Sequence, residues 1–177
     1  MSIEQFLSEQ KDAILKGWFD LVLDTYPPDT ASFLKKQDNP FTNPVGHTIR
    51  EGMGHILDEL AGETPSGQIG AFLDNIIRIR AVQDLTPERA LSFIFSLKEV
   101  VREALRAESR QPLPYDELLA FESRVDRLAL TSFGIFVQCR EKLYDIKANE
   151  LRNMTFRLLQ QVNNVDEDQG KKPDPAD

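Results

Sequence analysis

The chain has 177 residues, of which 41% are hydrophobic and 28% charged, a balance typical of one globular domain rather than of a disordered chain. Lys and Arg number 21 against 29 Asp and Glu, so the formal net charge is -8, and no basic cluster interrupts it. Nucleic-acid-binding surfaces and contacts with anionic membranes both need clustered positive charge, so this composition argues against both functions.

Cysteine content and the N-terminus carry further information about the cell compartment. Cys139 is the only cysteine, which rules out an intrachain disulfide. The first residues lack the basic and apolar regions of a signal peptide, and no apolar run approaches the roughly 20 residues that cross a bilayer. We therefore expect a cytoplasmic protein without membrane insertion.

Apolar residues recur at three- and four-residue spacing along almost the whole chain, which predicts helices. No segment shows the alternation and turn signals of a β-hairpin, so the predicted fold class is all-α. The expected helices cover about residues 3–22, a short stretch after 29–30, then 45–60, 68–82, 87–107 and a long helix from 115.

Turn and capping residues mark the boundaries of these helices. Pro27 and Pro28 end the first, and Asp29 or Thr30 is suited to cap the second. Thr86 followed by Pro87 predicts a helix start, because proline at the first helical position loses no hydrogen bond. Inside the long helix, Gly134 is expected to allow a close contact with another helix.

The C-terminal part of the long helix has fewer apolar residues, but they keep a heptad spacing. We call this narrow stripe the seam; it consists of Tyr144, Lys147, Leu151, Met154, Leu158, Gln161 and Val165. A seam of this kind suits a helix that pairs with its symmetry mate or leads towards another domain, and the alternative is an extension that lies on its own bundle. We expect a helical domain over 1–143, a linker or dimerisation helix over 144–165 and a disordered tail over 166–177.

A first candidate site lies on the helix predicted over 45–60. His47, Glu51 and His55 follow one another at four-residue intervals and so share a face of that helix. A metal site is one interpretation, since His and Glu one turn apart can share a cation. However, the two histidines are about 12 Å apart along the helix axis, too far for one ion. A solvated polar face or a protein interface is the alternative, and we expect no metal.

A second candidate site lies at the end of the helix predicted over 68–82. Arg78 stands one turn after Asp74, as in an ordinary surface ion pair. Arg80 continues the apolar face, so its guanidinium is expected to point inward and to need a partner, for which Asp84 is the nearest acid. The pair is either a structural latch or a contact with an anionic ligand.

Sequence motifs of catalysis are absent from the chain. There is no phosphate-binding glycine loop, no zinc-binding cysteine pair and no nucleophile elbow. Cys139 is in phase with the apolar face of the long helix, which predicts an inert core thiol. We therefore expect a protein that is not an enzyme.

Three segments together resemble a known family: Asn43–Arg50, Arg78–Asp84 and Leu91–Lys98. They are similar to the N-terminal domain of RsbR-type RsbT co-antagonists, the sensory part of stressosome proteins, over about residues 5–160. The resemblance implies a dimeric, globin-like helical bundle without haem, whose last helix leads towards a C-terminal STAS domain. This sequence ends at Asp177 without such a domain and is expected to be a stand-alone version.

The residues themselves argue against haem. In a globin-like layout the proximal ligand would lie on the helix over 68–82, which contains no His, Cys, Met or Tyr. We expect no cofactor.

The sequence thus predicts a sensory or regulatory domain that acts through protein contacts, as a homodimer with an unknown protein partner. The dimer contact is expected on the long helices, including Tyr144, Leu151, Met154 and Leu158. The alternatives are a small-ligand- or metal-binding accessory protein, and a structural adaptor in a larger complex. The residues expected to bind a ligand or partner are Asn43, His47, Arg50, Arg78, Arg80, Gln83 and Asp84.

Overall fold

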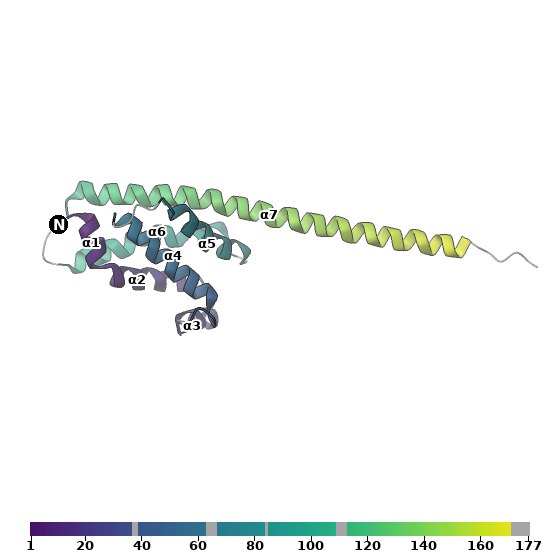
Figure 1. Cartoon of the computed structure of the whole chain (residues 1–177), viewed down its shortest axis with the longest axis horizontal. Helices are drawn as coiled ribbons and strands as arrows, with labels where there is room; N and C mark the ends of the chain where they lie inside the picture. The colour runs from purple at the N-terminus through teal and green to yellow at the C-terminus, as the bar shows by residue number, and fades with distance from the viewer. Residues whose placement is uncertain (37–38, 63–66, 84, 109–112, 171–177) are drawn as a thin grey trace, which may run out of the picture. The chain divides into compact units, whose positions relative to one another are not determined.

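The protein is all-α in the computed structural model, which describes residues 1–36, 39–62, 67–83, 85–108 and 113–170, with side chains up to residue 161 (Figure 1). These ranges contain seven helices and no strand, which confirms the predicted fold class. The helices are α1 (Ile3–Glu9), α2 (Lys11–Leu23), α3 (Pro28–Lys36), α4 (Pro44–Leu60), α5 (Ile69–Val82), α6 (Pro87–Ala107) and α7 (Tyr115–Gly170). The likeness to globins stays a prediction.

The chain divides into two compact units, Met1–Cys139 and Arg140–Asp177. The division falls within α7, four residues before the boundary expected after residue 143. Helix α7 continues to Gly170 and so includes the first residues of the predicted tail. The rest of that tail, residues 171–177, lies outside the described residues.

Local signals explain most helix boundaries. The Ser2 hydroxyl accepts a hydrogen bond from the Gln5 amide at 3.2 Å and caps α1. Helix α3 begins at Pro28, so the expected caps Asp29 and Thr30 lie inside its first turn. The single helix predicted over 3–22 is wrong: the chain breaks at Gln10, whose φ of -103° and ψ of 12° leave helical geometry.

The core of the first unit is built around α2, α4, α5 and α6. Trp18 is 1% exposed; its ring stacks on Phe93, and its indole N–H donates to the Phe93 carbonyl at 2.5 Å. Two glycines let the helices approach. A Cβ on Gly52 of α4 would lie 2.9 Å from Ile76 of α5, and one on Gly17 of α2 would lie 3.3 Å from Val100 of α6.

No described residue makes the close contact expected at Gly134. A Cβ there would meet nothing within 4 Å, so the glycine is exposed on α7 rather than packed against a neighbouring helix. Cys139 is partly buried against the core. Within the described residues, no helix combines the length and hydrophobicity of a transmembrane span.

Candidate functional site

Arg80 is completely buried and joins three parts of the first unit. Its Nε donates to the carbonyl of Ala90 at 2.8 Å, and its Nη2 to that of Arg89 at 2.7 Å, both in α6. On the other side, Nη1 donates to the Tyr26 hydroxyl at 3.2 Å and Nη2 to the Thr25 hydroxyl at 2.9 Å, just after α2. Arg80 therefore links the ends of α5 and α2 to the beginning of α6.

The structure describes four partners of Arg80 but does not test the expected one. All four of these acceptors are neutral oxygens, whereas the sequence suggested Asp84, which lies outside the described residues. The Tyr26 hydroxyl in turn donates to Gln83 at 2.9 Å, so Gln83 belongs to the same network. Burial lowers the pKa of Arg80 from its ordinary value, an effect that the neighbouring Tyr26 opposes.

The polar face of α4 lines a groove with α2 of about 460 Å³. His47 and Arg50 lie in it, with the His47 Nε2 3.7 Å from the Glu51 carboxylate. The Arg50 guanidinium lies 4.5 Å from the centre of the Phe19 ring. His55 also lines the groove and stacks on Phe72, with 4.4 Å between ring centres. Among the described residues, no three His, Cys, Asp or Glu side chains gather to hold a metal ion.

The remaining predicted site residues have local partners. Asn43 is 1% exposed; its amide donates to the Leu34 carbonyl at 3.0 Å, and its Oδ1 accepts from the Gly46 amide at 2.9 Å. It caps α4 and ties it to α3. Arg78 is exposed and pairs with Asp74, which raises the pKa of Arg78. The predicted residues are thus distributed over the Arg80 network, the α2–α4 groove, a helix cap and a surface ion pair.

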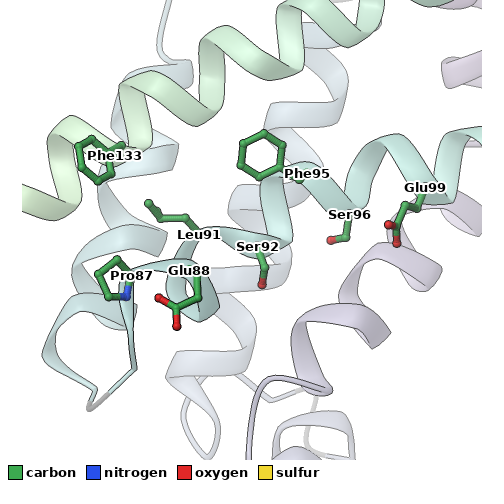
Figure 2. A pocket seen from close by; sticks show the side chains of 8 residues that line it. All are labelled: Pro87, Glu88, Leu91, Ser92, Phe95, Ser96, Glu99 and Phe133. Atoms are coloured by element: carbon green, nitrogen blue, oxygen red, sulfur yellow. The ribbon is translucent and has the colours of Figure 1, made fainter.

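A site that the sequence did not single out lies between α6 and α7 in the first unit. Figure 2 shows Leu91 and Phe95 of α6 lining the same hollow as Phe133 of α7, with polar side chains of α6 such as Glu88 and Glu99 at its edge. Phe95 and Phe133 are 51% and 53% exposed, and Leu130 of α7 is 74% exposed. We call this apolar hollow of about 520 Å³, with its continuation over Leu130, the α6–α7 groove.

Helix α7 in the second unit presents a second apolar surface. Tyr144, Leu151, Met154 and Leu158 of the seam are each between 59% and 64% exposed. Apolar side chains also lie off the seam, since Ile146 is 54% and Phe156 is 62% exposed. Such exposure of large apolar side chains is typical of surfaces that contact other proteins.

Comparison with known proteins agrees with the resemblance seen in the sequence. The family model described as the RsbT co-antagonist protein rsbRD N-terminal domain matches residues 12–151, which cover α2 to α6 and much of α7. Searches of curated proteins and of solved structures found no significant match.

Proposed function

Because the chain belongs to the family of RsbT co-antagonist protein RsbRD N-terminal domains, we propose that it is a stressosome-type regulatory domain that acts through contacts with other protein chains and has no catalytic role. The observation that carries this proposal is the exposure of large apolar side chains on two surfaces, the α6–α7 groove and the seam. A regulatory domain needs such surfaces to report its state to a partner.

The seam is the proposed dimer contact. Its apolar members Tyr144, Leu151, Met154 and Leu158 occupy positions of the alternating three- and four-residue pattern with which two helices pair. Pairing would bury side chains that are more than half exposed in the single chain. A signal that shifts the packing of the first unit would then be passed on through this helix pair.

Sedimentation velocity tests the dimer contact. The double substitution of Leu151→Ser and Leu158→Ser removes two seam positions and is expected to raise the dimer dissociation constant by about tenfold or more. The matched control replaces Ile146 and Phe156 by Ser, because both are similarly exposed on the same helix but lie off the seam. A seam variant that stays as dimeric as the control contradicts the proposal.

The α2–α4 groove supports a second candidate, the binding of a small ligand. It brings His47 and His55 together with Lys11, Arg50 and Glu51, a mixture of donors and acceptors that suits a small polar molecule. A thermal-shift screen of small metabolites and of Zn²⁺ tests this candidate. A stabilisation that is lost in the Arg50→Met variant supports it, and no shift by any compound counts against it.

A further inference from the structure

The turn between α3 and α4 exposes an aromatic side chain almost completely. Phe41 is 94% exposed, more than any other large hydrophobic residue among the described ones. Such a side chain gains nothing from the fold of its own chain. Rigid aromatic side chains are common anchors of protein interfaces, where they fill a pocket of the partner.

Hydrogen bonds fix residues 39–43 of this turn. The side-chain oxygen of Asn39 accepts from the Phe41 amide at 2.9 Å, and its carbonyl accepts from the amides of Thr42 at 3.2 Å and Asn43 at 2.9 Å. Asn43 in turn is tied to both neighbouring helices, and a Cβ on Gly46 would collide with its side chain at 2.3 Å. Phe41 is therefore presented on a pre-organised turn, which lowers the entropy lost on binding.

The α6–α7 groove has the properties of a receptor for an aromatic ring. Phe95 of α6 and Phe133 of α7 line the hollow together with Leu91 (Figure 2), so an inserted ring would meet aromatic side chains from two helices. Glu88 and Glu99 line the same hollow, and Asp126 lines its continuation. Lys98, which lies 5.9 Å from the centre of the Phe95 ring, is paired with Asp126, so the edge of the groove stays acidic.

The Phe41 turn of one copy and the α6–α7 groove of another are complementary in charge, and they lie on different sides of the first unit. Helix α3, which leads to the Phe41 turn, ends with the exposed Lys35 and Lys36. Lys35 pairs with Asp20 at 2.8 Å, whereas Lys36 is opposite in sign to Glu88 and Glu99 of the groove. In the first unit α3 lies on the side away from α7 (Figure 1), so one copy does not fill its own groove.

We propose that Phe41 of one copy inserts between Phe95 and Phe133 in the α6–α7 groove of a second copy. The inference rests on the proposed function, since it names the partner of the groove as another molecule of this chain. The contact joins different surfaces of the two copies. In such a pair, the groove of the first copy and the Phe41 turn of the second copy stay unoccupied and can each bind a further copy. Repetition gives head-to-tail assemblies that grow with protein concentration.

The experiment uses the full chain carrying Leu151→Ser and Leu158→Ser, so that pairing through the seam does not contribute. Sedimentation velocity over rising protein concentration is expected to show growing assemblies of this parent. Adding Phe41→Ser, or Phe95→Ser, is expected to weaken association by about tenfold or more. Phe33→Ser is the matched control, because Phe33 is 50% exposed on α3 but lies outside the turn, and it should associate like the parent.

Mixing the Phe41→Ser variant with the Phe95→Ser variant tests the proposed contact most directly. The Phe41→Ser variant keeps an intact groove and the Phe95→Ser variant keeps an intact Phe41, so together they should form a one-to-one dimer that does not grow further. Circular dichroism and the emission of Trp18 confirm that each variant is folded. The proposal is overturned if the parent stays monomeric, if Phe41→Ser associates like the parent, or if the mixture stays monomeric. The seam dimer is measured separately, so either idea can fail without the other.

Discussion

Substitutions of Arg80 test whether its buried network is a structural latch. Four hydrogen bonds from a charged donor contribute about 1.5–3 kcal/mol each before the cost of burying the guanidinium is subtracted. Arg80→Ala removes these bonds and leaves a cavity among buried residues, so we expect a loss of about 3–5 kcal/mol in the free energy of unfolding.

Replacement by Met or Lys separates the effect of charge from that of volume. In Arg80→Met, the hydroxyls of Thr25 and Tyr26 still donate to Val22 and Gln83, and the α6 carbonyls keep their helical bonds. No donor is left unsatisfied, so the expected loss is about 1–2 kcal/mol. In Arg80→Lys, a compact ammonium keeps the buried charge but does not span acceptors on both sides, and the expected loss is about 3–4 kcal/mol.

Urea unfolding provides the measurement. Trp18 is the only tryptophan and is buried against Phe93, so its emission reports on the same core. The protein concentration is held constant, because association of copies shifts the unfolding transition. Stability should fall in the order wild type, Met, Lys. A Lys variant as stable as the wild type, or a Met variant less stable than Lys, would refute the reasoning.

Thermal unfolding checks the direction of the stability change that we expect for three further substitutions. Ser132 is fully buried, and its hydroxyl has no hydrogen-bond partner among the described residues, so Ser132→Ala should stabilise the protein by about 1 kcal/mol; a loss of stability would mean that the hydroxyl is satisfied. Gly134→Ala should also stabilise by up to about 1 kcal/mol, since the new Cβ meets nothing and alanine favours the helix. Gly52→Ala should destabilise by about 1 kcal/mol, because its Cβ would lie 2.9 Å from the buried Ile76, and an increase in melting temperature would show that this core relaxes.

Periodicity and caps predict the helices of this chain well, but not which helices touch. The start of α6 at Pro87 follows directly from Thr86 and proline geometry. The inward direction of Arg80 also follows from its place on an apolar face. Its partners do not, because Tyr26 and Thr25 lie 54 and 55 residues away in sequence, and only the packing of α2 on α6 brings them near.

The α6–α7 groove was missed for a related reason. Phe95 widens the apolar stripe of α6, which favours complete burial on pattern alone, yet it is half exposed because α7 does not cover it. Gly134 shows the converse: a glycine in an apolar helix predicts a close neighbour, and the part of the chain that the structure describes does not provide one. Sequence patterns identify apolar faces, whereas the number of neighbours available to cover them is a property of the folded unit.

The attachment of α1 has a consequence for the order of folding during synthesis. The Ile3 amide donates to the Glu117 carboxylate at 2.6 Å, and Glu4 pairs with Arg124 at 3.1 Å, both across more than a hundred residues of chain. These bonds close only after the start of α7 has left the ribosome, although α1 is made first. The first helix of the chain therefore makes these long-range contacts only late in synthesis, although its residues Ile3, Phe6 and Leu7 are buried in the finished fold.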